Sequence, residues 1–374
     1  MLTPQSRKED FPSLEGIAYL NTAAESIPPR CVGEAVHTYL RDKQQGMKGR
    51  EAHYATLEAC REIGARFTGL QPQEIGFCSC SSEAYNLLAT ALDSNASEEV
   101  VITDLDFPAG ATPWLRAARG PRVRLWQSVE GELRLSDLEP LLNPRTRLVQ
   151  VSLVSFYNGF RIPWGRFRDC VRRCAPRAVL AVDVTQALGR IPIDSQDADV
   201  LVCSTHKWTL GLHGGCLVGV PAAGASALTT RAGGWFHLTN AFEADRFERA
   251  VAREGAASYG VGMPNFVALY ALNASLRYLE RTGVSAIEHH ANPLTRRVHD
   301  GLVRRGLQPL APWQPQSPSG IVAFRHPQSE SIHAALEASK VHVMHHAGRI
   351  RVAVHGYNSE EDIERFLRGL DQAL

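Results

Sequence analysis

The chain has 374 residues, of which 44% are hydrophobic and 21% are charged, and its formal net charge is +1 at pH 7. This composition is ordinary for a globular protein with a large core, and the near-neutral charge does not favour nucleic acid or a membrane surface as a partner. No apolar run approaches the roughly 20 residues that span a bilayer, and residues 1–16 contain no apolar signal core. We therefore expect a cytoplasmic protein whose partners are small molecules and a second copy of itself.

In the first two-thirds of the chain, short apolar runs alternate with segments of helical spacing. Residues 84–92 and 165–175 are predicted to be helices. The apolar, β-branched runs are predicted to be strands: residues 99–105, 147–155, 178–184, 199–204 and 215–220. Near-continuous apolar strands separated by helices indicate an α/β fold in which helices sandwich a mostly parallel sheet.

After about residue 260 the pattern changes to that of a smaller α+β domain. Residues 309–320 are proline-rich and predict turns. The expected elements are a helix over 266–283, strands over 321–325 and 349–355, and a helix over 359–374 that Ser359 caps. We place the large domain at residues 16–260, and the small domain at residues 1–15 and 261–374.

The eight cysteines include no Cys-x-x-Cys pair, and none follows Cys216. In a cytoplasmic chain they are interpreted as free thiols that pack as small hydrophobes, and neither a disulfide framework nor a metal site is expected.

Three features lie where predicted strands end, which is where open α/β sheets bind their ligands. Asp183 ends one strand, and it either faces a cationic ring nitrogen or caps the segment that follows. Residues 79–83 lead into a helix with serine hydroxyls beside free N–H groups, which suits either phosphate or ordinary N-capping. Lys207 follows the strand 199–204, and in a partly dry pocket it would be an amine nucleophile rather than a solvated loop lysine.

Motifs for other chemistries are missing. No GxGxxG follows the first strand, and there is no GxxxxGK[ST], HExxH or Gly-x-Ser-x-Gly sequence. This argues against a nicotinamide dehydrogenase, a P-loop NTPase, a zinc protease and an α/β-hydrolase. A phosphate-type helix start, an aspartate and a lysine are instead the groups that pyridoxal 5′-phosphate (PLP) requires, since the lysine holds its aldehyde and the aspartate keeps its ring nitrogen protonated.

The sequence resembles the class V aminotransferase family of PLP enzymes of fold type I, which includes cysteine desulfurases and isopenicillin N epimerase-like proteins. The similarity runs over nearly the whole chain, from residues 18–29 to residues 351–363. It is strongest in VDVTQALGRIPID, residues 182–194, and in DVLVCSTHKW, residues 199–208.

The resemblance implies a role for each matching residue. Lys207 would form the Schiff base and act as the catalytic residue, Asp183 would pair with the pyridinium nitrogen, and Gln186 would donate to the phenolic oxygen. Arg351 would bind the α-carboxylate of the substrate, unless it is an exposed strand arginine. The phosphate would be held by four further residues: Ser81, Ser82, Ser204 and His206.

The match has departures. Phe107 occupies the position of an aromatic ring that stacks on the cofactor, but phenylalanine cannot exchange protons. Residues 258–265 resemble the segment that reaches the neighbouring subunit's phosphate, which predicts a homodimer, although Met263 replaces a common threonine there. Residues 341–354 lack the nucleophilic cysteine of the desulfurases.

Two groups of residues have two possible interpretations each. His345 and His346 are site acids or bases, or a solvent-facing pair, which we favour, and Trp235, Phe236 and His237 line the pocket or pack in the core.

The predicted function is a PLP-dependent reaction at the Cα atom of an amino acid: the substrate first replaces Lys207 on the cofactor, and the freed Lys207 amine then takes the Cα proton as general base. β-Elimination of the C–S lyase type is our first choice, and transamination and epimerisation follow it. A pseudoenzyme that kept the cofactor site and lost the chemistry is the alternative outside catalysis.

Overall fold

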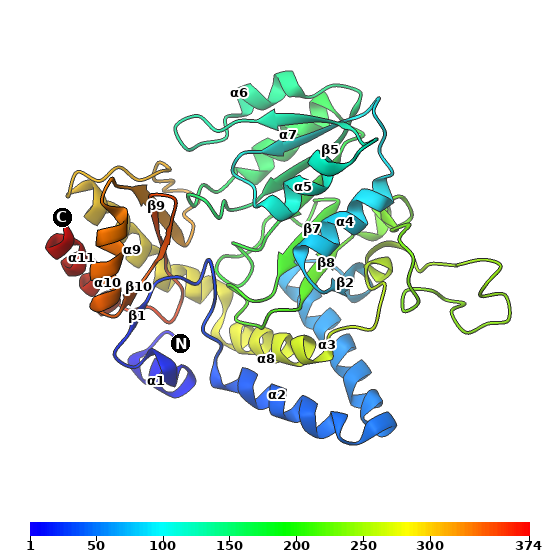
Figure 1. The fold of residues 1–374 in the computed structure, drawn as a ribbon, viewed down its shortest axis with the longest axis horizontal. Helices are drawn as coiled ribbons and strands as arrows, with labels where there is room; N and C mark the ends of the chain where they lie inside the picture. Colours follow the sequence, from blue (N-terminus) through cyan, green and yellow to red (C-terminus); the bar gives the residue numbers. More distant parts are fainter.

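The structure is a computed structural model that describes residues 1–374, and its centre is a seven-stranded sheet (Figure 1). The strand order is β2-β8-β7-β6-β5-β3-β4, and every neighbouring pair is parallel except the two pairs that β8 makes. The strands are β2 (Ile75–Cys78), β3 (Glu99–Thr103), β4 (Arg122–Trp126), β5 (Thr146–Ser152), β6 (Val179–Asp183), β7 (Val200–Ser204) and β8 (Cys216–Gly219). The predicted α/β fold with a mostly parallel sheet is confirmed.

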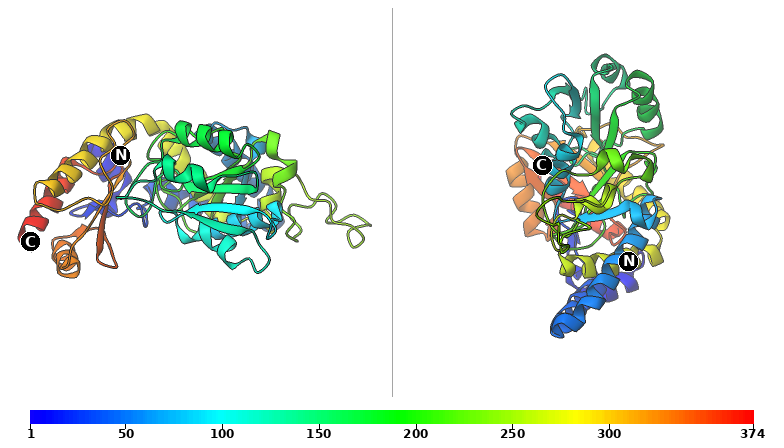
Figure 2. Two further views of the ribbon diagram at one scale, coloured as in Figure 1. Left: turned by 90° about the horizontal axis from the view of Figure 1, so that it is seen from above. Right: turned by 90° about the vertical axis from the view of Figure 1, so that its right-hand side faces the viewer.

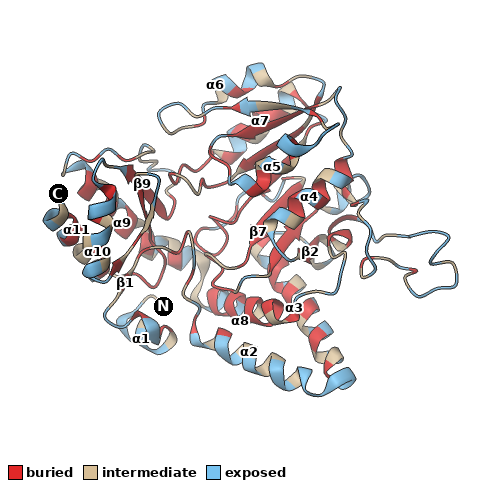
Figure 3. Cartoon of the chain, viewed as in Figure 1, coloured by how far each residue is buried: buried red, intermediate tan, exposed pale blue.

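Helices cover both faces of this sheet because alternate residues of each strand point to opposite faces. On β6, Leu180 and Val182 belong to a core of 51 residues, whereas Ala181 belongs to a separate core of 19 residues. The larger core includes side chains of α3 (Arg50–Thr68), α7 (Trp164–Cys174) and α8 (Phe266–Thr282). The smaller core includes those of α4 (Ser81–Leu92) and α5 (Pro108–Arg116). Figure 3 shows the resulting buried interior of the strands.

A second, smaller unit has its own core of 20 residues. Its antiparallel sheet has the order β11-β12-β9, and a separate parallel pair joins β1 to β10. These strands are β1 (Ala18–Tyr19), β9 (Ile321–Arg325), β10 (Val341–His342), β11 (Met344–His346) and β12 (Arg349–Ala353). The helices are α9 (Val284–Val303), α10 (Ser329–Ala338) and α11 (Glu360–Ala373). The predicted α+β unit at the C-terminal end is confirmed.

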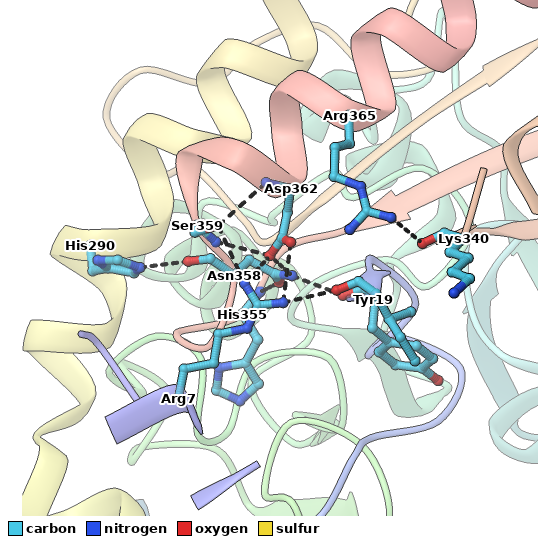
Figure 4. Close-up of polar contacts among 10 residues, drawn as sticks. Arg7, Tyr19, His290, Lys340, His355, Asn358, Ser359, Asp362 and Arg365 are labelled. Carbon is cyan, nitrogen blue, oxygen red and sulfur yellow. Dashed lines mark hydrogen bonds and ion pairs between the residues drawn. The ribbon is translucent and has the colours of Figure 1, made fainter. Parts of the chain in front are cut away.

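The N-terminal segment is hydrogen-bonded to the small unit. Arg7 in α1 (Pro4–Asp10) donates from Nη1 to Asp362 Oδ2 of α11 over 2.9 Å, and Asn358 Nδ2 donates to the Tyr19 carbonyl over 2.8 Å (Figure 4). Ala18 packs in the small core, whereas Leu272 of α8 packs in the large one. The domain boundaries after residues 15 and 260 stay a prediction.

The remaining elements lie mostly at the surface. They are α2 (Arg30–Lys43), α6 (Leu135–Leu138) and the 3-10 turns Pro12–Leu14, Gly46–Gly49, Pro72–Glu74, Glu139–Leu141, Ala222–Gly224, Ser226–Leu228 and Gly255–Tyr259. Residues 235–253 form a long loop that extends away from the rest of the chain (Figures 1 and 2). None of the helices combines the length and apolarity needed to cross a bilayer.

Candidate active site

The candidate site lies at the carboxyl edge of the parallel strands, where β6 ends at Asp183 and β7 ends at Ser204. The turn after β7 is held by Thr205, whose Oγ1 donates to the carbonyls of Leu212 and Gly215 over 2.8 and 2.9 Å. This turn carries Lys207, so its backbone is fixed at the mouth of the sheet. Glycine at position 215 allows Thr205 to pack this closely against the backbone, since a Cβ added at Gly215 would lie 2.7 Å from Thr205 Oγ1.

Lys207 is mostly withdrawn from solvent, and burial lowers the pKa of its ammonium group. The positive charge of Arg351 lowers that pKa further, while Asp183 acts in the opposite direction. The Nζ atom lies 5.1 Å from the ring centroid of Phe107. A lysine with a lowered pKa is more often a free amine at neutral pH, which is the form that attacks an aldehyde.

Asp183 is 8% exposed and has two hydrogen-bond donors. Tyr85 Oη donates to its Oδ2 over 3.1 Å, and the Thr185 N–H donates to its Oδ1 over 2.8 Å. The second contact is the capping contact considered from the sequence. Neither donor is a cation, so the buried carboxylate can still pair with a cationic ring nitrogen. Sequence reasoning missed Tyr85, whose contact with Asp183 depends on the packing of α4 against the sheet.

Gln186 is already engaged within the chain. Its Oε1 accepts from Trp208 Nε1 over 2.6 Å, and its Nε2 donates to the Ala23 carbonyl over 3.0 Å. One amide N–H remains for a ligand, which leaves room for the expected contact with a phenolic oxygen.

The N-terminus of α4 offers free hydrogen-bond donors. Its N-cap residue, Cys80, makes no side-chain capping bond, so the first N–H groups of the helix are free. Ser82 and Ser204 are engaged only through backbone atoms, which leaves their hydroxyls and that of Ser81 without partners in the chain. Free N–H groups and hydroxyls at a helix start suit an anion, and ordinary capping by Ser81 or Ser82 is not observed.

His206 is a neutral ring rather than a cation in this arrangement. Burial, and next the charge of Lys207, lower the pKa of His206 to about 4. The ring stacks on His213 with centroids 4.2 Å apart, and His213 Nε2 lies 3.1 Å from Glu25 Oε2. Any contact of His206 with a phosphate would therefore use a neutral imidazole.

Arg351 reaches the site from the small unit. It is 3% exposed, so the alternative of an exposed strand arginine does not hold. Its Nη1 donates to the Phe156 carbonyl over 2.7 Å, while its buried Nε has no partner. Burial, and next the charge of Arg349, lower the pKa of Arg351 to about 9. An unpaired, buried guanidinium beside Lys207 is a ready site for a carboxylate.

Phe107 and Phe156 form an aromatic wall beside Lys207. Their ring centroids are 5.0 Å apart at an interplanar angle of 84°. Phe107 follows the buried Asp106, which accepts from the Ser152 N–H over 2.7 Å and from the Thr103 N–H over 3.1 Å. Asp106, which the sequence did not single out, thereby fixes the turn that presents Phe107.

Several residues considered from the sequence have partners away from Lys207. His345 Nε2 lies 3.1 Å from Ser329 Oγ, and His346 is exposed. Trp235 packs against Phe242 with ring centroids 5.7 Å apart, and Phe236 stacks on Tyr54 of α3 at 6.3 Å. The two remaining residues differ in burial: His237 is 1% exposed and Met263 is 38% exposed.

Comparison with known proteins identifies the family. Residues 18–366 match the model of the aminotransferase class-V family. The chain belongs to this family. The resemblance inferred from the sequence is therefore confirmed, and with it the assignment to PLP-dependent enzymes.

Class V relatives share almost the whole length of the chain. The chain is 29% identical over 363 residues to an uncharacterized aminotransferase, YcbU, of Bacillus subtilis (strain 168). The match covers 96% of this chain and 95% of that protein. The apo structure of a cysteine desulfurase from Thermococcus onnurineus NA1 superposes with a TM-score of 0.88 at 24% identity, covering 100% and 98% of the two chains. A complex of the cystine C–S lyase C-DES with cysteine persulfide gives a TM-score of 0.87 at 22% identity, covering 96% and 98%. Another C-DES structure contains glycine covalently linked to its PLP cofactor.

The residues of this class V chain fit PLP. The free helix N-terminus of α4 and three unpartnered hydroxyls suit the phosphate, Asp183 is a buried carboxylate without a cationic partner, and Lys207 is a desolvated amine. Asp183 and Ser204 end the neighbouring strands β6 and β7, and Lys207 lies in the turn that follows β7.

Proposed function

We propose that this class V enzyme eliminates a β-substituent, most simply a thiol, from an amino acid. The observation that carries the proposal is the unpaired guanidinium of Arg351, buried beside the desolvated amine of Lys207. An α-amino acid brings a carboxylate for the first group and a Cα–H bond for the second.

Each residue would have a separate task. Arg351 would bind the α-carboxylate and orient the Cα–H bond. Lys207 would hold PLP through its amine and, as a free amine, would take the Cα proton as general base. Asp183 would keep the ring nitrogen of PLP protonated, and α4 with Ser81, Ser82 and Ser204 would hold the phosphate. When bound, PLP supplies an electron sink for the charge that develops at Cα.

The burial of Cys203 favours elimination over transfer of sulfur to that thiol. Cys203 is the cysteine whose charge state is linked to Lys207, and burial raises its thiol pKa well above the ordinary range. A buried, protonated thiol is a poor nucleophile. A thiolate can leave Cβ without a strong acid, and the C–S lyase activity in the name of C-DES supports the same reaction on this fold.

Two other outcomes are less favoured. Transamination is supported by the name of the Bacillus subtilis relative and uses the same lysine. Epimerisation would need a second proton donor, whereas the wall beside Lys207 consists of the hydrocarbon rings of Phe107 and Phe156.

A panel of amino acids in heavy water, with PLP and mass-spectrometric readout, separates these reactions. Elimination predicts a keto acid with equimolar ammonia and a released thiol. Keto acid with accumulating pyridoxamine phosphate would show transamination, and recovered substrate deuterated at Cα with inverted configuration would show epimerisation. Lys207→Ala is the inactive control, and it should also lose the visible absorption band of the lysine-bound cofactor. Normal turnover by this variant would refute the role of Lys207.

We also propose that the enzyme is a homodimer. Large apolar side chains are exposed on the loop 235–253, with Phe242 at 82% and Phe247 at 89%. The adjoining Met263 belongs to the segment that, by the family resemblance, reaches the partner's phosphate site.

A further inference from the structure

One face of the small sheet carries a row of positive charges without acids. In the antiparallel register, Arg349 of β12 lies opposite Arg325 of β9, and Arg351 lies opposite Ala323. Side chains directly opposite each other share a face, as do alternate residues of one strand. The full set on this face is Ile321, Ala323, Arg325, Met344, His346, Arg349, Arg351 and Ala353. It contains three arginines, one histidine and no carboxylate.

The other face of β12 packs against the small core. Ile350, Val352 and Val354 are all in that core, so the arginine row must point the other way, toward the loop that follows β5. Both backbone contacts agree with this direction: Arg351 donates to the Phe156 carbonyl, and Arg349 Nη1 donates to the Tyr157 carbonyl.

Tyr157 holds the two outer arginines in place. The guanidinium of Arg349 lies 4.1 Å from the Tyr157 ring centroid, and Arg325 Nη2 donates to the Tyr157 hydroxyl over 2.7 Å. The loop itself is fixed, because Ser155 Oγ donates to the Leu105 carbonyl over 3.0 Å and accepts from the Tyr157 N–H over 3.1 Å. The guanidinium groups are therefore pre-positioned rather than free to follow a ligand.

The row lacks counter-ions although two of its arginines, Arg349 and Arg351, are buried. Arg349 is 4% exposed, yet it has no salt bridge, and its Nε and Nη2 make no hydrogen bond within the chain. Burial lowers the pKa of Arg349, and the charge of Arg325 adds to this effect. A guanidinium has five N–H donors, and one carbonyl and one ring satisfy few of them. Buried charges of one sign are costly unless an opposite charge pairs with them. We therefore expect an anion to bind to this row of arginines.

We propose that Arg349, supported by Arg325, forms a second carboxylate site beside Arg351, so that the substrate is an amino acid with an acidic group at the far end of its side chain. This proposal rests on the proposed function, since it takes Arg351 as the site of the α-carboxylate. Alternate residues of a strand are about 7 Å apart. Flexible diacids of five or six carbons can bridge neighbouring arginines at that spacing.

Binding of unreactive diacids tests this inference without turnover. We expect the PLP-loaded enzyme to bind glutarate and adipate at least tenfold more tightly than butyrate and hexanoate in isothermal titration calorimetry, because only the diacids reach both sites. Arg349→Met should remove this advantage, and Arg349→Lys should restore part of it. Arg304→Met, which removes an exposed arginine elsewhere in the small unit, is the matched control. Equal affinity for diacids and monoacids in the native enzyme, or an advantage that survives in Arg349→Met, would overturn the inference.

Kinetics and a second variant keep the result interpretable. If Arg349→Met does not fold, Arg325→Met, whose side chain is exposed, should lower the diacid advantage about threefold, and no change would count against the site. On an acidic amino-acid substrate, Arg349→Met should raise KM at least tenfold, and the increase in KM on a neutral amino acid should be several-fold smaller. A diacid preference without elimination would refute the proposed reaction alone, whereas elimination without that preference would refute the second site alone.

Discussion

At the scale of single residues, the site depends on the charges around one amine. Burial is the largest influence on the pKa of Lys207, followed by Asp183, which raises it, and Arg351, which lowers it. We also propose that Asp183 pairs with the cofactor and that Arg351 binds the substrate. Removing either charge should therefore change the reactivity of Lys207 as well as binding.

Removing the charge of Arg351 and removing that of Asp183 should shift the pKa of Lys207 in opposite directions in the cofactor-free protein. Arg351→Met should raise the pKa of Lys207 because it removes a neighbouring positive charge. Asp183→Asn should lower that pKa because it removes the negative charge that raises it most. The pH dependence of PLP addition to the cofactor-free protein, followed by absorbance, measures both: the rate profile should move to higher pH in the first variant and to lower pH in the second. Shifts in the same direction would contradict this account of the site, and Arg304→Met should shift neither.

At the scale of elements, the sequence predicts what is local and misses what depends on distant pairing. The strands that end at Asp183 and Ser204 were predictable because long apolar runs fix buried parallel strands. β1 was not, since it has two residues and exists only through the pairing of Ala18 with Val341. Arg349 illustrates the same limit. The Arg-x-Arg spacing on β12 was a readable sign of two arginines on one face, but their burial depends on the loop after β5.

The junction of α1, β1 and α11 is a second element that depends on distant contacts. Asp362 is 2% exposed and accepts from Arg7 Nη1, Arg7 Nη2, Asn358 Nδ2 and the Ser359 N–H over 2.9, 3.2, 3.2 and 3.0 Å (Figure 4). Four donors from three residues, which belong to the two ends of the chain, thus meet at one carboxylate.

We expect Asp362→Ala to lower the free energy of unfolding by about 3 kcal/mol, because it leaves a partly buried guanidinium and a helix N-cap without their acceptor. Urea denaturation followed by circular dichroism measures this change. Glu361→Ala, an exposed acid in the same helical turn, should have little effect. An equal decrease in the free energy of unfolding in the two variants would mean that the contacts of Asp362 stabilise the protein no more than an exposed acid does.

At the scale of the whole molecule, one copy leaves much apolar surface uncovered. The loop 235–253 extends from the large unit (Figure 2), and Phe242 and Phe247 on it are 82% and 89% exposed. Tyr54, Trp235, Phe236 and Phe242 line a hollow of about 390 Å³ at the base of this loop. Exposed aromatic rings on and beside this loop indicate a surface that is covered in the assembled protein.

We expect a homodimer in sedimentation equilibrium, and we expect the double variant Phe242→Ser, Phe247→Ser to raise its dissociation constant at least 100-fold. Each phenylalanine that is buried on association contributes about 2 kcal/mol, and a two-fold axis counts each substitution twice. The matched control is Leu115→Ser with Val303→Ser, which removes two apolar side chains, 61% and 53% exposed, from other parts of the surface. A monomeric native protein would refute the dimer. A dimer that both double variants leave equally intact would place its interface elsewhere. If the segment around Met263 completes the partner's phosphate site, dissociation of the phenylalanine variant should also weaken PLP binding, and dilution of the native protein should do the same.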